Sequence, residues 1–237
     1  YGDRLRRMLP GVWDAELATV TIQHLKSVIA EMLETRAATT VNGYVRTAKA
    51  FFYYCQDNDY PVAFNPRKLK KIREPKRIPP CFTPEQVRAL IEQPDKSTLT
   101  GLRDHTMMSL MLDVGLRLSE LTGLEVSDIT LPYAKVRGKG NKERVVAMSD
   151  VMVKSLRKYL RARERALQRA RSQTDLLFFT RTCERLPNRR MDFILKAYGR
   201  QAGVTGVRVS AHTFRFTYTS MAVRNGMSLT SLQTCLG

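Results

Sequence analysis

The chain has 237 residues, 43% of them hydrophobic, which is enough to bury a real core as one large domain or two modest ones. Its formal net charge of +18 indicates a polyanionic partner, nucleic acid in preference to an anionic membrane surface. No apolar run approaches the roughly 18 residues needed to span a bilayer, and no segment has the order of a signal peptide. We therefore expect a soluble, intracellular protein.

The four cysteines argue against a cross-linked or metal-bound fold. Cys55, Cys81, Cys183 and Cys235 show neither paired spacing nor a nearby histidine cluster. Reduced thiols are expected, with no metal and no cofactor.

Two amphipathic segments come first along the chain. Residues 21–33 and 39–56 each space apolar side chains on one helical face, which predicts two packed helices. The second helix also presents a polar set that either enters a DNA groove or faces water, and the sequence leaves both open. This polar set consists of Thr40, Asn42, Arg46 and Lys49.

A basic segment then divides the chain. Residues 67–77 hold seven basic side chains against one acidic one, and Pro79-Pro80 follows, which cannot continue a helix. This pattern predicts a linker over 67–80, between a helical domain at 1–66 and a second domain at 81–237.

Both parts of the chain are basic. Residues 1–80 carry 14 basic and 8 acidic side chains, and residues 81–237 carry 26 and 14, giving +6 and +12. A run of like charge is usually only solvated. Because this run connects two basic domains, we expect Lys70 and Lys71 to lie against a phosphate backbone.

The second part begins with a helix start. Thr83 can cap the amide of Gln86, which reaches back to it, and Pro84 takes the first helical position, so a helix should run to about Glu92. The apolar spacing over 101–114 predicts another helix, which the following glycine ends.

The remaining elements are a hairpin and several helices. β-Branched residues within 129–148 predict a hairpin around the turn at 138–142, which makes Lys139 a residue of a mobile turn. The long helix predicted at 150–171 has eight basic residues and one acidic residue from Lys154 onward, interpreted as a solvated face rather than a contact surface. Further helices are predicted at 193–202, 212–224 and 228–236.

Five polar residues stand out by their order. Arg117 follows a glycine and precedes Glu120 by three, while His212 and Arg215 lie one helical turn apart. Each pair alone is weak, since a histidine three residues before an arginine more often has a structural or N-cap role, and an arginine beside a glutamate is commonly an ordinary ion pair. Arginine forks, however, give two parallel hydrogen bonds to phosphoryl oxygens and stay charged. With Lys139 between them, the set suits phosphate chemistry.

This ordered set resembles the tyrosine recombinase family, also called the phage integrase or Xer-type family, over nearly the whole chain. The segments at 122–124, 126–129 and 138–144 carry the resemblance, as does the closing Leu236-Gly237. The resemblance implies a mainly α fold with a small β-hairpin or sheet. It further implies a C-shaped clamp of two domains, a helical core-binding domain and a catalytic domain.

The resemblance also implies a role for each residue. Arg117 and Arg215 would clamp the scissile phosphate, with Glu120 supporting Arg117. Lys139 would protonate the departing 5′ oxygen, and His212 would assist proton transfer to and from the nucleophile. These roles suit an in-line attack, which builds charge on the non-bridging oxygens and leaves an alkoxide that needs a proton.

The implied partners are double-stranded DNA and further copies of the chain. Lys142 and Arg144 of the hairpin motif are expected to contact DNA. The family acts as a homo-oligomer, usually a tetramer on two DNA sites, with no membrane partner, so we expect a cytoplasmic protein associated with the nucleoid.

The sequence departs from the family near its end. In the family the Leu-Gly segment is followed by histidine or tryptophan and later by the tyrosine that forms a 3′-phosphotyrosyl bond, and neither follows here. Tyr218 is expected to pack in the core, and Phe216 stands where many members have a second histidine. The start at Tyr1 lies within a predicted first helix. We therefore expect an incomplete chain that binds DNA without cleaving it.

Three functions fit these patterns. The first is a site-specific recombinase or integrase that cuts and rejoins DNA through a covalent tyrosine. The second is a non-catalytic DNA-binding regulator that keeps the phosphate clamp, and the third is an enzyme like type IB topoisomerases. An RNA-binding role is disfavoured, because the sequence has no interleaved aromatic and glycine pattern.

Overall fold

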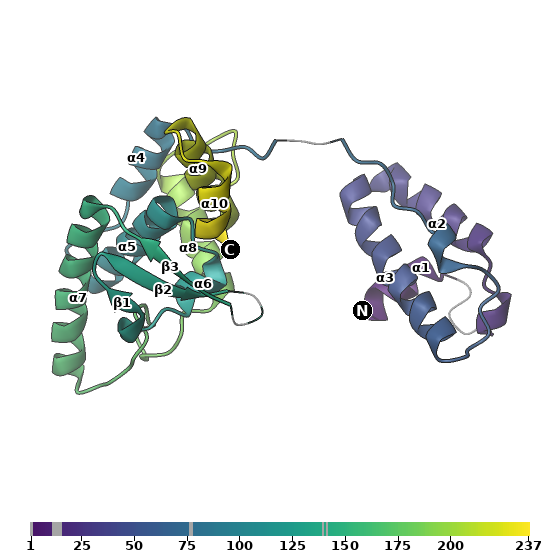
Figure 1. Cartoon of the computed structure of the whole chain (residues 1–237), viewed down its shortest axis with the longest axis horizontal. Helices are drawn as coiled ribbons and strands as arrows, with labels where there is room; N and C mark the ends of the chain where they lie inside the picture. The colour runs from purple at the N-terminus through teal and green to yellow at the C-terminus, as the bar shows by residue number, and fades with distance from the viewer. Residues whose placement is uncertain (1, 11–15, 76–77, 139, 141) are drawn as a thin grey trace. The chain divides into compact units, whose positions relative to one another are not determined.

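The computed structural model describes residues 2–10, 16–75, 78–138, 140 and 142–237. The chain divides into two compact units, residues 1–77 and 78–237, each with a hydrophobic cluster of its own (Figure 1). This division falls inside the segment predicted as a linker.

The N-terminal unit is helical. It contains α1 (Gly2–Met8), α2 (Ile22–Thr35) and α3 (Ala38–Asp57), with short 3-10 turns at Leu17–Thr19 and Pro66–Lys68. The two helices predicted at 21–33 and 39–56 are confirmed to within two residues at each end. Their apolar faces meet in a core whose most buried side chains include Leu25, Val41, Val45 and Phe52.

Part of the predicted linker is packed on this unit by Asn42. The Asn42 side-chain amide donates to the carbonyl of Ile72 at 2.9 Å and to the Glu74 carboxylate, and its oxygen accepts from the Ile72 amide at 2.8 Å. Asn42 is only 3% exposed. The sequence placed Asn42 in a polar set that faces water or a DNA groove, whereas the structure buries it. Burial is possible because a side-chain amide can pair with both the N–H and the carbonyl of a neighbouring extended segment.

The other polar residues of this region face outward. Thr40, Arg46, Lys70 and Lys71 are exposed, whereas Lys49 is half-buried with its ammonium 5.9 Å from the centre of the Tyr53 ring. Four exposed groups therefore remain available to a partner.

The C-terminal unit places helices around a small antiparallel sheet. The sheet order is β1-β2-β3, and β2 pairs with β3 so that Ala134 faces Val146 and Val136 faces Arg144. The strands are β1 (Ile129–Thr130), β2 (Tyr133–Arg137) and β3 (Glu143–Ala147). The helices are α4 (Pro84–Glu92), α5 (Leu99–Val114), α6 (Leu118–Thr122), α7 (Asp150–Ala170), α8 (Asn188–Gln201), α9 (Ala211–Arg224) and α10 (Leu229–Leu236).

Most of these elements follow the sequence pattern, and one start does not. The capping box of Thr83 and Gln86 begins α4 as predicted. Helix α8 begins five residues before the predicted start at 193. Its inward face begins at Met191, which is fully buried, whereas Phe193 is 64% exposed. The predicted start was too late because it took Phe193 as the first residue of the apolar face.

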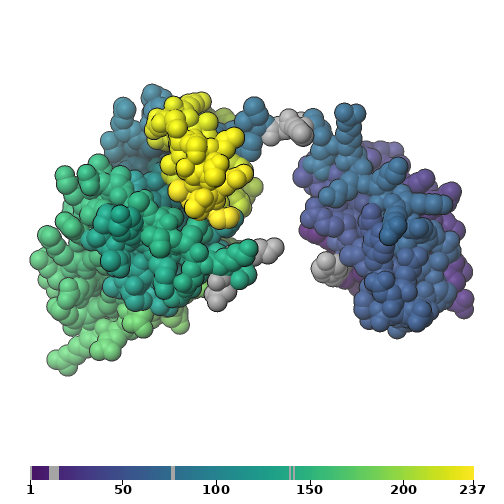
Figure 2. Space-filling model, in the orientation of Figure 1, coloured from purple at the N-terminus to yellow at the C-terminus, as the bar shows by residue number. Residues whose placement is uncertain are grey.

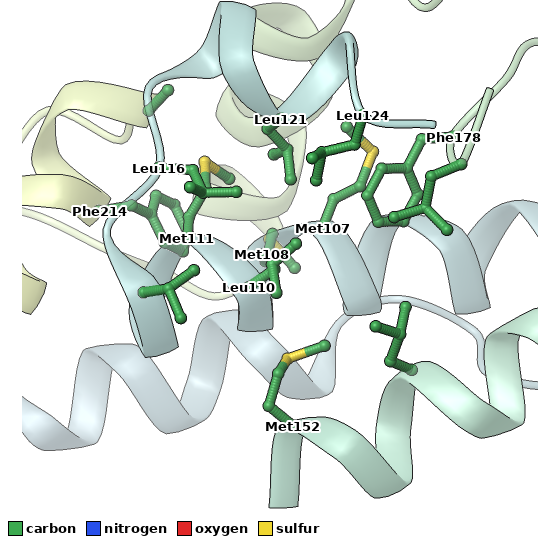
Figure 3. Close-up of a cluster of buried hydrophobic side chains, with 14 of the residues drawn as sticks. Met107, Met108, Leu110, Met111, Leu116, Leu121, Leu124, Met152, Phe178 and Phe214 are labelled. Atoms are coloured by element: carbon green, nitrogen blue, oxygen red, sulfur yellow. The ribbon is translucent and has the colours of Figure 1, made fainter. Parts of the chain in front are cut away.

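Helix α5 forms the centre of this unit. Met107, Met108, Leu110 and Met111 are all fully buried, so α5 is covered on nearly every side (Figure 3). Side chains from α6, α7 and α9 pack onto it, including Leu121, Met152 and Phe214. Because close packing resists small displacements, α5 fixes the positions of the elements that flank it.

Along the part of the chain that the structure describes, every helix is too short or too polar to cross a membrane.

The Asn42 anchor gives a test of the packed linker. We expect Asn42→Ala to lower the free energy of unfolding by about 1–3 kcal/mol, because it leaves the partly buried main-chain groups of Ile72 unpaired. Urea unfolding measures this, and limited proteolysis should cut residues 70–75 faster. Thr40→Ala, on an exposed position of the same helix, is the matched control. Equal stability of the two variants would contradict the anchor.

Candidate active site

Two arginines converge on one buried carboxylate, and a third guanidinium lies beside it. The Glu120 side chain is 2% exposed, and its Oε1 accepts from Arg117 Nη1 at 2.8 Å and from Arg144 Nη1 at 3.0 Å. Its Oε2 accepts from Arg144 Nη2 at 2.8 Å and from the Arg117 main-chain amide at 2.8 Å. Arg215 Nη1 lies 4.0 Å from the same oxygen. The carboxylate thus holds three guanidinium groups from separate parts of the chain in one place.

A glycine turn brings two of these arginines together. Gly115 ends α5 with a φ of 65°, and its carbonyl accepts from Arg215 Nη1 at 2.7 Å. Two residues later, Arg117 stands at the N-cap position of α6, where its main-chain amide donates to the Glu120 carboxylate. A Cβ on Gly115 would lie 2.3 Å from Cδ1 of Tyr218, so both the backbone conformation and the space demand glycine.

The electrostatics of the cluster favour an anion. Burial raises the pKa of Glu120, but the hydrogen bonds from Arg144 and Arg117 outweigh burial and hold this pKa below its ordinary value. Burial, with repulsion from Arg117, lowers the pKa of Arg215, although a guanidinium stays charged at any physiological pH. Three cations and one anion leave a net charge of +2, which suits a phosphate that gains charge during reaction.

Main-chain carbonyls from the end of α10 also lie at this cluster. Arg144 Nε donates to the carbonyl of Cys235, Arg215 Nη2 to that of Leu236 and Arg117 Nη2 to that of Gly237, each at 2.8 Å. The space-filling view shows this yellow segment against the teal surface of the hairpin (Figure 2). These carbonyls accept from guanidinium N–H groups, which are also the donors that a phosphate would accept from. Each guanidinium has five N–H groups, so it can donate to more than one acceptor at once.

The three arginines differ in access to solvent. The side chain of Arg117 is 39% exposed, against 15% for Arg215 and 10% for Arg144. Arg117 is therefore the guanidinium most open to an incoming ligand.

His212 lies on the helix that carries Arg215, and one predicted residue, Lys139, is outside the described residues. His212 is exposed in the first turn of α9, one turn from Arg215, and Ser210 rather than His212 caps that helix. Gly138, the neighbour of Lys139, is close to the cluster, since a Cβ there would lie 3.6 Å from Glu120 Oε1.

Arg144 occupies a different environment from the one expected. The sequence predicted a DNA contact for Lys142 and Arg144 alike, and Lys142 is exposed, but Arg144 forms a two-pronged ion pair with Glu120. The strand pattern carried a signal for this. Side chains alternate along β3, so Arg144 shares the inward face of Val146, and a charge on a buried face needs a buried partner.

Tyr218 lies behind this cluster. It is 8% exposed and packs with Ala222 and Leu232, and burial raises the pKa of its hydroxyl. The Tyr218 ring packs directly against the backbone of Gly115, as expected for a core residue. Phe216, on the other face of α9, is 42% exposed.

Within the described ranges, no group of three or more His, Cys, Asp or Glu side chains is placed to hold a metal ion.

Removal of the Glu120 charge gives a test of the cluster. We expect Glu120→Gln to lower the free energy of unfolding at pH 7 by roughly 3–5 kcal/mol, because it leaves arginines without their buried counter-charge. A lowered carboxyl pKa stabilises the fold above the ordinary value of 4.5 and ceases to do so as the pH falls through the folded value. Urea unfolding between pH 7 and pH 3 should therefore show an acid-induced loss that is smaller in Glu120→Gln. Parallel pH profiles for the two proteins would refute this account.

The glycine turn has a matched pair of variants. Gly115 and Gly203 have similar positive φ values of 65° and 63°, but only Gly115 has a neighbour within 4 Å of a Cβ. We expect Gly115→Ala to destabilise the protein by about 1–3 kcal/mol more than Gly203→Ala, because overpacking adds to the shared backbone strain. Thermal unfolding of both variants measures the difference. Equal losses would show that the contact with Tyr218 yields at little cost.

Comparison with known proteins places this cluster in context. Residues 80–237 match the profile described as the Phage integrase family. The chain is 34% identical over 212 residues to tyrosine recombinase XerC of Chlamydia caviae, covering 89% of this chain and 67% of that protein. It is 29% identical over 209 residues to tyrosine recombinase XerD of Listeria monocytogenes, covering 86% and 69%.

Solved structures share the fold. The XerH site-specific recombinase bound to a palindromic difH substrate, in a post-cleavage complex, aligns with a TM-score of 0.81 at 17% identity, covering 99% of this chain and 70% of that one. A lambda integrase tetramer bound to a Holliday junction aligns with a TM-score of 0.77 at 15% identity, covering 99% and 68%.

Proposed function

Because the chain belongs to the phage integrase family, we propose that it acts in site-specific DNA recombination, with strands cut and rejoined through a 3′-phosphotyrosyl intermediate. The arginine cluster around Glu120 carries this proposal. None of the tyrosines among these 237 residues is assigned as the nucleophile.

The cluster supplies what the phosphate chemistry needs. An in-line attack on a phosphodiester concentrates negative charge on the non-bridging oxygens, and cations fixed in advance stabilise that charge at least reorganisation cost. Arg117 and Arg215 are fixed by Glu120 and by the Gly115 carbonyl. Both would bind the scissile phosphate. The phosphate would replace the carbonyls of residues 235–237 as the hydrogen-bond acceptor, or would share the guanidinium N–H donors with them. Arg144 would hold Glu120 rather than touch the phosphate.

Proton transfer is proposed for two further residues. His212 is exposed one turn from Arg215, so it can reach a group bound there and assist proton transfer to and from the nucleophile. Lys139 follows Gly138, whose neighbourhood includes Glu120, and would protonate the departing 5′ oxygen.

The N-terminal unit would hold the flanking duplex. Its exposed Thr40, Arg46, Lys70 and Lys71 would contact the phosphate backbone, as would Lys142 of the hairpin. Assembly as a tetramer on two DNA sites is proposed in keeping with the lambda integrase complex.

Cleavage by an arginine variant tests the proposal. In protein expressed from its complete coding sequence, we expect Arg215→Ala to lower strand cleavage by roughly 10²-fold or more, the effect of removing one fixed charge-stabilising donor. A suicide substrate that traps the covalent adduct measures the rate. The control is Arg224→Ala, an exposed arginine at the far end of the same helix. Cleavage by Arg215→Ala at the control rate would refute the assignment, and mapping the trapped adduct would identify the tyrosine.

A further inference from the structure

We infer that the exposed basic face of α7 is a second surface for the DNA backbone, separate from the cluster at Glu120. We name this surface the α7 stripe. Its members are Lys154, Arg157, Lys158, Arg161, Arg165 and Arg169. The inference rests on the proposed function only in taking duplex DNA as the polyanion that the protein meets.

The helix gathers these six cations on one side. Their spacings of one, three or four residues place them within a sector of about 120° around the axis. All six are exposed. The opposite side of the helix is buried against the core through Met152, Leu156 and Tyr159. From Lys154 to Arg169 the stripe is about 22 Å long, at a rise of about 1.5 Å per residue.

The stripe has no internal counter-charge. No ion pair among the described residues includes any of its six members, and Glu164 lies just beyond the edge of the sector. Asp150, one turn before Lys154, is the acidic residue of this helix that shares the face. Ordinary solvated helices alternate the sign of their surface charges. Like charges three or four residues apart destabilise a helix, so the stripe does not serve the stability of α7.

The stripe is remote from the arginine cluster. Figure 1 places α7 at the opposite edge of the C-terminal unit from α6 and from the end of α10, where the cluster lies. One phosphate cannot contact both surfaces. A groove of about 290 Å³ beside the stripe, lined by Arg165, Arg169 and residues 97–99, gives its far end a recess in which a backbone can lie.

The dimensions fit one strand of a duplex. Neighbouring cations on a helical face are about 5–6 Å apart at their Cβ atoms. A DNA strand carries one charge per roughly 3.4 Å of helix axis but winds around that axis, so a straight stripe of about 22 Å meets only the few phosphates that face it. Single-stranded nucleic acid would call for aromatic side chains on which bases stack, and this face of α7 has none. Lysine and arginine contacts to phosphate carry no sequence information, so binding here is independent of sequence.

A charge-matched pair of variants tests the stripe on this chain. The test variant is Arg161→Gln with Arg165→Gln, and the control is Arg88→Gln with Arg224→Gln, which removes equal charge from exposed positions elsewhere. On a 60-base-pair duplex of random sequence, we expect the slope of log affinity against log salt to become shallower by about 1.8 in the test variant, at about 0.9 per lost phosphate contact. The control should change far less. Fluorescence anisotropy from 50 to 200 mM salt measures both, and thermal unfolding verifies that both variants fold.

The outcomes separate the stripe from its alternatives. The loss should be equal on two unrelated duplex sequences, because contacts to phosphate carry no sequence information. Test and control variants with the same slope would overturn the inference, as would a loss seen with duplex RNA or an acidic peptide but not with DNA. In the cleavage assay, run on protein expressed from the complete coding sequence, the test variant should stay within about twofold of the parent protein. If the test variant shows the shallower salt slope but the complete parent protein never cleaves, the proposed function fails and the stripe stands.

Discussion

The ion-pair cluster of Glu120 is the interaction on which the site depends. Three guanidinium groups repel one another, and a site that gathers them needs a compensating charge among them. Glu120 provides that charge while buried, and a buried carboxylate is tolerable only when its oxygens are paired. Its partners arrive from the cap of α6 and from β3, while α9 brings the third arginine within 4.0 Å. The same carboxylate therefore stabilises the fold locally and orients the groups proposed to bind phosphate.

Helix α5 makes this convergence geometrically possible. Its methionines and leucines fill the centre of the C-terminal unit, and the flanking helices pack against it. The turn at Gly115 then leads the chain from the core into the cluster, with its carbonyl bound by Arg215. Dense packing transmits small shifts rather than absorbing them. Substitutions in the core of α5 thus affect the arginines through the backbone, with no contact to a ligand.

The sequence predicts local structure here better than it predicts burial of polar groups. The capping box of Thr83 and the glycine after Val114 are local signals, so α4 and α5 follow from a few neighbouring residues. Asn42 and Arg144 belong to polar patterns, yet both are buried because segments distant in sequence pair with them. Such partners are invisible to periodicity. The alternation of β3 gave the one local warning, and Lys139 stays a prediction.

Two uses of positive charge are combined in the C-terminal unit. At Glu120 two of the three cations are largely buried and all are held by directional hydrogen bonds, so ionic strength screens their mutual interactions weakly. On α7 the cations are exposed and unpaired among the described residues, so their attraction for a polyanion weakens steeply with salt. Chemistry at a single phosphate needs the first arrangement, because charge must be in place before the transition state forms. Retention of a long polymer needs the second, because many weak contacts tolerate sliding and any sequence. A protein that finds one site in a long duplex and then reacts there has reason to keep the two surfaces apart.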